Sequence, residues 1–357
     1  MIPYVEIIQK SDLKIIAIVE PQECWFEITY NDVGECEVYA TASISNMQNL
    51  IIGNYVKIPN KPYAWVITSI NYTYAEGVPM ISAKGKDAKW LLYKRVIQDP
   101  LELPNKAALA VEQLVYNNLG AGAAGARVIS GFNVASSGIT TALNETQAAR
   151  ANLLDFIINI LKTYKLGCMV TYQNESLTFS VINGQDKSET VRFSQSFDNL
   201  LESSYLLDDS NIGTNALVVS TVDNVDYTQV YDKGATGVDR AEILIKSNLS
   251  TEYTPNGATE PTKLDLTNPN DLQLYNSWLT QEGRTSLNDY VEKKAINSTL
   301  DLANSQYEFE NDYNVGDIVG VIDDYFKYDA KARIIKLTIN QNANGYGEEA
   351  EFKEEIS

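Results

Sequence analysis

The sequence GNYVKIPNKPYAWVITSINYTYAEGVPMISAKGKDAKWLLYKRVI, residues 53–97, decides the fold class of the first part of the chain. Its runs at 53–59, 63–74 and 78–85 are rich in β-branched and aromatic residues, and turn residues separate them, so they predict three strands. A short run at 86–96 has one apolar side and Asp87 as a candidate cap, which predicts a helix that closes the unit.

Three runs that precede this stretch have the same character: 13–19, 24–30 and 34–43. Short strands at near-regular spacing with turn signals between them are typical of a small barrel or sandwich. We therefore predict a first barrel-like β domain over residues 1–98.

The segment 99–199 changes to a helical period and predicts an α+β domain. The run NKAALAVEQLVYNNLG, which follows Pro104, predicts one helix. A stronger helix is predicted from Asn144 as cap, with Gln147 three residues later, to Gly167. A hairpin over 168–182 should follow, turning at Asn174-Glu175.

The last segment, 200–357, predicts a second barrel-like β domain that is interrupted by helices. Asn268-Pro269 should begin one helix, and a second should run from about Arg284 to Asn304 with Leu287, Val291, Ala295 and Leu302 on one side. The expected insertion therefore spans about 268–304, and the β domain spans about 200–247 and 305–345. The predicted fold class is α+β, with two small β-barrel-like domains and α/β lower domains. The expected strands are 217–222, 227–232, 241–247, 306–311, 317–322 and 331–341.

Composition excludes several kinds of catalysis. The 357 residues contain no histidine, so a Ser-His-Asp or Cys-His unit is impossible within the chain. The three cysteines are scattered without a C-x-x-C pair, which disfavours a zinc site and predicts unpaired thiols: Cys24, Cys36 and Cys168. Chemistry by carboxylates alone, or no chemistry, is what remains.

Pairs of acidic residues are the candidates for such chemistry, but no spacing places any pair across a cleft, as a glycosidase requires. The pairs are Asp208-Asp209, Asp223 with Asp226, Asp323-Asp324 and Glu348-Glu349. The stretch DLTNPND, 265–271, lacks the spacing of a calcium-binding loop, and Asn268 is better interpreted as a helix cap. We predict no enzyme and no catalytic, metal-binding or cofactor-binding residues; a carboxylate hydrolase is the enzymatic alternative.

The formal net charge of −19 is unevenly distributed. Residues 200–357 contain 12 basic and 28 acidic residues, a net charge of −16, and such a surface repels nucleic acid. No apolar run approaches the ~20 residues that a membrane helix needs, and the first residues lack the pattern of a secretory signal. We expect a protein that is made in the cytoplasm and does not insert into a membrane.

The order of elements resembles that of the baseplate or tail hub proteins of tailed phages. Residues 53–97 resemble the family's strands and short helix that ends at an Arg, here Arg95. The stretch YNVGDIVGVIDDYFKYDAKARIIKLTIN, residues 313–340, is similar to the family's closing hairpin, with its Gly316-Asp317 entry and its Ala332-Arg333-Ile334 strand. Each motif alone is an ordinary turn or strand, so their order and joint presence carry the resemblance.

The resemblance implies a virion tail protein, assembled in the host cytoplasm, whose trimer forms a ring of six β domains. That ring would join the tail tube to the tip and pass DNA without binding it specifically. Implied partners are the distal tail, tail tube and tape-measure proteins and tail-fibre or tip proteins. Because KEEIS comes close after the closing hairpin, we expect no lytic extension. A carbohydrate-binding or adhesin module, suggested by 22 tyrosines, is the alternative from another class.

Overall fold

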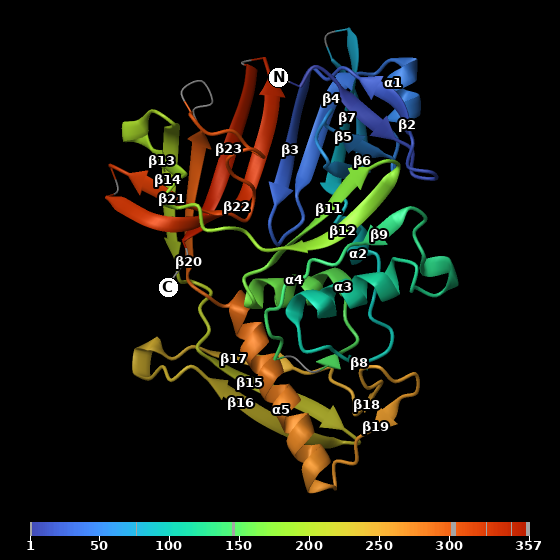
Figure 1. Cartoon of the computed structure of the whole chain (residues 1–357), viewed down its shortest axis with the longest axis vertical. Helices are drawn as coiled ribbons and strands as arrows, with labels where there is room; N and C mark the ends of the chain where they lie inside the picture. The colour runs from blue at the N-terminus through green and yellow to red at the C-terminus, as the bar shows by residue number, and fades with distance from the viewer. Residues whose placement is uncertain are drawn as a thin grey trace.

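The computed structural model describes residues 2–75, 77–144, 147–300, 305–325, 327–343 and 345–354. The fold is α+β and mostly strands, as predicted. A large sheet occupies one end of the molecule, two helices and a small sheet lie beneath it, and a lower module lies at the other end (Figure 1). No described helix is long and apolar enough to cross a membrane.

The first half of the large sheet contains the strands predicted from residues 13–85, with one addition at the amino terminus. Its strands are β1 (Val5–Ile8), β2 (Ile15–Val19), β3 (Glu23–Thr29), β4 (Glu35–Thr41), β5 (Tyr55–Lys57), β6 (Ala64–Ala75) and β7 (Val78–Asp87). Two short helices accompany them, α1 (Ile44–Asn49) and α2 (Trp90–Tyr93). Burial alternates along β3, where Cys24, Phe26 and Ile28 face the core, as expected for a strand with one covered face.

The second half of the sheet is formed by segments from the rest of the chain: β13 (Arg192–Ser194), β14 (Leu200–Asp208), β20 (Lys293–Leu300), β21 (Ile318–Asp323), β22 (Tyr328–Asn342) and β23 (Gly345–Glu354). The predicted closing hairpin is confirmed by the antiparallel pairing of β21 with β22. The predicted strand at 306–311 is absent, and only a single bridge joins Phe309 to Tyr313.

The two halves form one continuous sheet because β22 pairs with β3 from Lys336 opposite Thr29 to Gln341 opposite Cys24. Strand order is β14-β20-β23-β22-β3-β4-β7-β6-β5-β1-β2, with β13 and β21 attached beside β22. Among the described strands no barrel closes, because β3 satisfies its outer backbone edge on β22 rather than within its own half.

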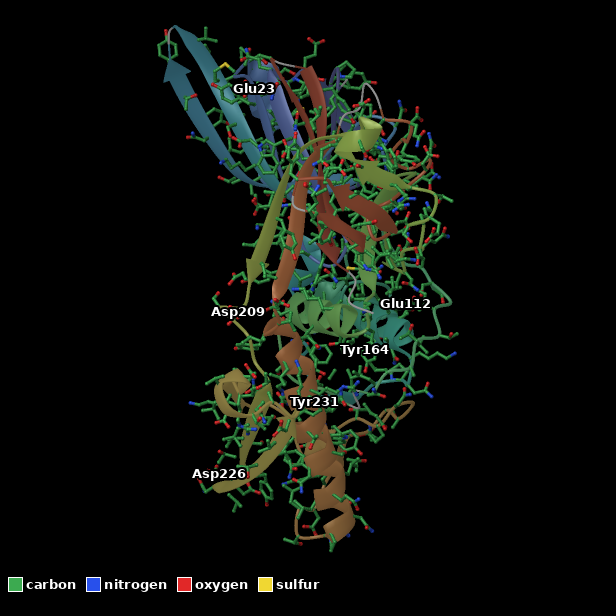
Figure 2. The ribbon with its side chains drawn as sticks, turned by 90° about the vertical axis from the view of Figure 1, so that its left-hand side faces the viewer. Glu23, Glu112, Tyr164, Asp209, Asp226 and Tyr231 are labelled. Carbon is green, nitrogen blue, oxygen red and sulfur yellow. The ribbon has the colours of Figure 1, made fainter. Side chains whose placement is uncertain are left out.

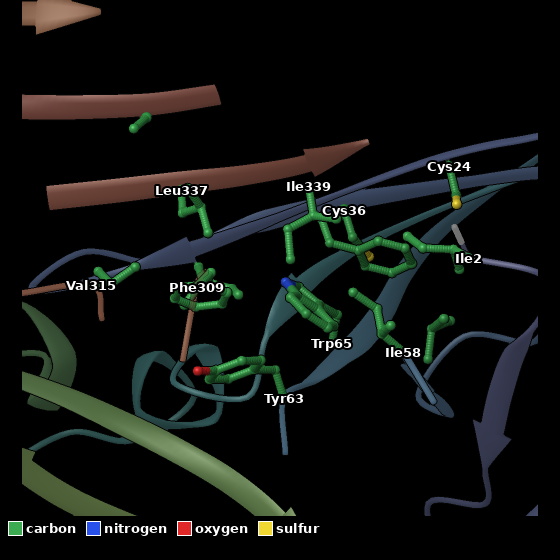
Figure 3. Packing of buried hydrophobic residues seen from close by; sticks show 14 of the residues in the cluster. Ile2, Cys24, Cys36, Ile58, Tyr63, Trp65, Phe309, Val315, Leu337 and Ile339 are labelled. Atoms are coloured by element: carbon green, nitrogen blue, oxygen red, sulfur yellow. The ribbon is translucent and has the colours of Figure 1, made fainter. Parts of the chain in front are cut away.

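A single hydrophobic core lies against both halves of the sheet (Figure 3). Trp65 is fully buried, its ring centroid lies 4.8 Å from that of Phe26, and its Nε1 donates to the carbonyl of Glu27 at 3.1 Å. Leu337 and Ile339 of β22 belong to the same core, so the halves are stabilised together.

The middle unit contains both predicted helices, α3 (Ala107–Asn118) and α4 (Leu153–Thr163), and a small sheet of β9 (Phe132–Val134), β11 (Gly167–Gln173) and β12 (Ser176–Ile182). The predicted hairpin turn is confirmed, since Asn174 and Glu175 have φ of 49° and 57°.

The predicted start of α4 was wrong. Its cap is Asn152, whose Oδ1 accepts hydrogen bonds from the amides of Leu154 and Asp155, and not Asn144. Gln147 lies instead in β10 (Gln147–Ala148), which pairs with β8 (Leu101–Glu102). Residues 151–152 pair with residues 96–97, so the helix begins only after Asn152.

The lower module is where the prediction for residues 200–304 departs most from the structure. Its strands, β15 (Asn215–Val222), β16 (Val225–Asp232) and β17 (Glu242–Lys246), pair only with one another among the described strands, although 200–247 was assigned to the second β domain. They pack on α5 (Pro269–Ser286), which Asn268 caps as predicted. A two-stranded ribbon completes the module, β18 (Glu252–Tyr253) with β19 (Thr262–Lys263).

The second predicted helix, 284–304, was also wrong. After α5 the chain enters β20, which pairs with β14 on one side and β23 on the other. Leu287 begins a 3-10 helix, Leu287–Asp289, before the strand. Within Lys293–Leu300, hydrogen bonding to two neighbouring strands outweighs the helical spacing that includes Ala295. Leu302 and the other residues at 301–304 lie outside the described part of the chain.

Candidate functional site

The large sheet has a polar face opposite its core, and this face is one candidate surface for function. Directly opposite residues on neighbouring antiparallel strands lie on the same face, so the register of β23, β22, β3, β4 and β7 defines it. We call it the outer sheet face; its charged and aromatic residues that are not buried are Glu23, Trp25, Glu27, Glu35, Glu37, Tyr39, Lys84, Lys86, Lys336, Glu349, Glu351 and Lys353. Figure 2 labels Glu23 near its upper edge.

The charges on the outer sheet face are partly paired. Lys86 lies 2.8 Å from Glu35, Lys84 lies 3.6 Å from Glu37, and Lys336 lies 3.0 Å from Glu351 and 3.5 Å from Glu27. The face nevertheless has six acidic and four basic residues that are not buried, so a small acidic excess remains. Exposed pairs of this kind contribute little stability, and the excess gives the surface a potential that repels phosphate.

The two ends of the large sheet form the second candidate surface. Among the described strands, β2 pairs only with β1 and β14 pairs only with β20, so each presents an open backbone edge. The β2 end exposes Ile15, Ile16 and Ile18, and α1, which contacts β2, adds Ile44 and Met47. The β14 end exposes Leu201, Tyr205, Leu206 and Leu207.

Apolar side chains of this size on open strand edges are unusual for a free surface, because they favour pairing with another chain. Neither end was predicted from the sequence. The available signal was consecutive apolar residues within a strand, Ile15-Ile16 and Leu206-Leu207, which place apolar side chains on both faces at once.

A buried junction joins the segments that contain the two motifs of the resemblance. Tyr30, just after β3, is fully buried, and its Oη donates to the carbonyl of Lys165 at 3.0 Å. The guanidinium of Arg333 lies 5.2 Å from the centre of the Tyr30 ring, and its Nη1 donates to the carbonyl of Gly316 at 2.7 Å. The Gly316-Asp317 and Ala332-Arg333-Ile334 motifs are therefore structural contacts between parts of the chain.

The carboxylates considered for chemistry are spread over the molecule, and they accept hydrogen bonds from residues close to them in the sequence. Figure 2 shows Asp209 where the lower module joins the body and Asp226 far from it in the module. Asp208 Oδ1 accepts from the amide of Ser210, Asp226 Oδ1 accepts from Thr221 Oγ1, and Asp323 Oδ1 accepts from the amide of Tyr325. Each contact shapes a local turn or strand end.

The remaining carboxylates are held in the same way. Glu348 is buried and its Oε1 accepts from the Tyr346 hydroxyl at 2.6 Å, whereas Glu349 is exposed on the opposite face of β23. Within 265–271, Asp265 accepts from Thr267 and Asp271 accepts from the amide of Asp265. Among the described residues no group of three or more Cys, Asp or Glu side chains could hold a metal ion.

Comparison with solved structures identifies the class to which this fold belongs. A tail protein from Neisseria meningitidis MC58 aligns with a TM-score of 0.55 at 11% identity, covering 99% of this chain and 96% of its own. The 43 kDa tail protein of prophage MuSo2 from Shewanella oneidensis also aligns with a TM-score of 0.55 at 11% identity, covering 98% of each chain. The fold is that of phage tail proteins.

The family follows from the sequence itself. The chain belongs to the family described as Siphovirus ReqiPepy6 Gp37-like protein, whose profile matches residues 5–352. No curated protein matches the chain. The resemblance to phage tail proteins drawn from the order of elements is thereby confirmed.

Proposed function

We propose that this chain is the non-enzymatic hub at the distal end of a phage tail, where three copies close a ring that continues the tail tube. The observation that carries the proposal is one sheet whose two β units leave an open, apolar end on either side. In the ring, the β14 end of one subunit lies against the β2 end of the next. The two halves of the sheet then act as the two ring domains of each subunit.

Ring closure requires two different patches on each subunit, because each contact is between unlike surfaces. A single self-complementary patch would give a dimer and no ring. The two ends satisfy this requirement, since one is formed by β2 together with α1 and the other by the edge strand β14. The proposed partners are the distal tail, tail tube and tape-measure proteins on one side of the ring and tip or fibre proteins on the other.

The outer sheet face is proposed to line the channel of the ring, so that DNA passes it without being held. Affinity for DNA comes mainly from clustered basic residues, and this face has an acidic excess. In an assembled tail, the outer sheet face should therefore point to the tail axis. A particle in which the channel wall is basic, or in which this chain lies off the axis as a monomer, would contradict the assignment.

The contribution of one side chain to ring closure follows from its exposure. Ile18 is 60% exposed, and complete burial of such a side chain stabilises by about 1.5–3 kcal/mol, so covering it contributes about 1–2 kcal/mol to each contact. A ring of three subunits repeats that contact three times. Replacing Ile18 by a charged residue should thus prevent closure without disturbing the core.

The test compares three variants by sedimentation at rising protein and salt concentration, because salt screens the self-repulsion of a chain with net charge −19. The wild type should form trimers, and Ile18→Asp and Leu207→Asp should each remain monomeric. Val238→Asp, which changes a fully exposed apolar residue of the lower module, should still assemble. Trimers unaffected by both end variants would refute the edge contact, and a wild-type chain that stays monomeric even with its tail partners would refute the ring.

A carbohydrate-binding role is the second candidate, and one observation favours it. Tyr72 and Tyr74 point to the same side of β6 and are both exposed, the latter by 77%, on a hairpin that extends beyond the rest of the sheet (Figure 2). Aromatic rings on such a tip can stack on sugars. Binding on a glycan array that is lost in Tyr74→Ala would favour this role over a purely structural one.

A further inference from the structure

Three of the seven arginines in the chain lie close together, although they come from separate segments. Arg95 follows α2, Arg127 ends the 3-10 helix Gly125–Arg127, and Arg150 lies shortly before α4. Gln98 connects two of them, because its Oε1 accepts a hydrogen bond from Arg127 Nη1 and its carbonyl accepts one from Arg150 Nε at 2.8 Å. Arg95 Nη2 donates to the carbonyl of Arg127 at 3.0 Å. We call these three residues the arginine cluster.

The charges of the arginine cluster have no acidic partner. Among the described residues none of the three forms an ion pair, whereas Arg240 of the lower module pairs with both Asp232 and Glu242. The cluster donates instead to neutral oxygens, such as the carbonyl of Val96 and the side-chain amide of Asn118. In a chain with 47 acidic and 28 basic residues, neighbouring arginines without a carboxylate form a positive region that differs from the rest of the molecule.

The uncompensated charge also acts on the cations themselves. Burial and the neighbouring charge of Arg127 lower the pKa of Arg95, and burial, Arg95 and Lys10 lower the pKa of Lys94. Asp99 is the acidic residue closest to Arg95 along the chain, and it is exposed and forms no ion pair among the described residues. A bound anion would therefore relieve a repulsion that the described part of the chain leaves in place.

Arg150 provides the accessible donors of the arginine cluster. The residue is exposed, its Nε bonds to the carbonyl of Gln98, and its two terminal nitrogens, Nη1 and Nη2, have no partner among the described residues. A guanidinium holds these nitrogens in one plane, which matches two oxygens of a carboxylate or of a phosphate. The cluster is thus suited to an anion that accepts two parallel hydrogen bonds.

The charge of the whole molecule decides between these two anions. A nucleic acid has a phosphate at every nucleotide, so most of its length would lie beyond the cluster, against a protein with a net charge of −19. An acidic segment of a protein can be short enough to contact the cluster alone. The balance of charge therefore favours carboxylates from a protein.

We propose that the arginine cluster is a docking site for a short acidic segment of a partner protein. One carboxylate of that segment makes two parallel hydrogen bonds with Arg150, and further carboxylates offset the charges of Arg95 and Arg127. The partner would then contact the molecule beside α2 and α4, below the large sheet (Figure 1). None of the three arginines belongs to the outer sheet face or to either end of the sheet, so the inference does not depend on ring assembly.

The test is a titration of the full chain with acetyl-Gly-Asp-Asp-Asp-Gly-amide and with its neutral counterpart, acetyl-Gly-Asn-Asn-Asn-Gly-amide. Binding is followed by the backbone amide NMR resonance of Gln98, which lies between two of the arginines. The acidic peptide should shift that resonance saturably, and the neutral peptide should bind about tenfold more weakly. Raising the salt concentration should weaken binding of the acidic peptide.

Variants separate the paired donors of Arg150 from charge alone. Arg150→Gln should weaken binding of the acidic peptide about 3–10-fold, and Arg150→Lys, which keeps the charge but not the paired donors, should lie between that variant and the wild type. Because the residue is exposed, both variants should keep a urea midpoint close to that of the wild type. Arg240→Gln is the matched control, since it removes the same charge from an arginine that already has acidic partners, and it should leave binding unchanged.

A single-stranded DNA of about 20 nucleotides tests the other source of anions, and it should bind more weakly than the acidic peptide. Tighter binding of this DNA than of the acidic peptide would overturn the proposal. Equal binding of the acidic and neutral peptides, or equal losses of binding in Arg150→Gln and Arg240→Gln, would overturn it as well.

Discussion

Replacing Tyr30 should reveal how much of the stability depends on the junction between the β units and the middle unit. The Tyr30 ring is fully buried and its Oη bonds to the carbonyl of Lys165, while its own carbonyl accepts from the amide of Cys168 at 2.9 Å. A Cβ added at Gly167 or Gly316 would lie 2.2 or 2.4 Å from the ring. The ring therefore fills a slot formed by segments distant in sequence.

The magnitudes follow from these contacts. Tyr30→Phe removes only the hydroxyl and should cost about 1–2 kcal/mol, because the Lys165 carbonyl loses its buried donor. Tyr30→Ala should cost about 4–6 kcal/mol, since an aromatic side chain lost from a core costs about 3–5 kcal/mol and the contact with Arg333 is lost as well. That is a large part of an ordinary folding free energy of about 5–15 kcal/mol.

The assay is equilibrium unfolding in urea, followed by tryptophan fluorescence. Tyr74→Ala is the matched control, because that tyrosine is exposed and its loss should change stability by no more than about 0.5 kcal/mol. A cost below about 2 kcal/mol for Tyr30→Ala would refute the reasoning. So would equal costs for Tyr30→Phe and Tyr30→Ala, because the ring would then contribute nothing.

Three further predictions concern other parts of the chain. Burial raises the pKa of the Cys24 and Cys168 thiols to about 12 and that of the Cys36 thiol well above its usual value. At pH 8 a thiol reagent should therefore label the native protein slowly, whereas it should label all three cysteines of the denatured protein rapidly. Fast labelling of the native protein would contradict this. Burial also raises the pKa of Glu282, so ionisation of this carboxyl destabilises the fold as the pH rises. Glu282→Gln should therefore raise the free energy of unfolding more at pH 8 than at pH 4. An equal gain at both pH values would contradict the prediction. Asn152→Ala should lower the free energy of unfolding by about 1 kcal/mol, because Asn152 caps α4, whereas Asn144→Ala should lower it by almost nothing. The midpoints of urea unfolding measure both effects. A larger effect of Asn144→Ala would instead support the cap predicted from the sequence.

Local patterns in the sequence determined the elements whose hydrogen bonds and burial are themselves local. The hairpin at Asn174-Glu175, helix α3 and the cap of α5 at Asn268 were all predictable, because turn geometry, helical period and capping act within a few residues. The absence of histidine likewise excludes whole classes of catalysis on composition alone. Gly316 and Arg333 were recognisable as parts of motifs, but their contacts with Tyr30 were not.

Only the tertiary structure decided which strands share a sheet. Lys293–Leu300 has an ambiguous pattern and becomes a strand because β14 and β23 supply hydrogen-bond partners on both sides. In the same way β3 pairs with β22, which lies near the other end of the chain, and this contact leaves the sheet open with apolar ends. The packing of α4 against α5 likewise joins segments that are distant in the sequence. Pairing and packing of this kind depend on free energies summed over segments far apart, and no short stretch of sequence contains that information.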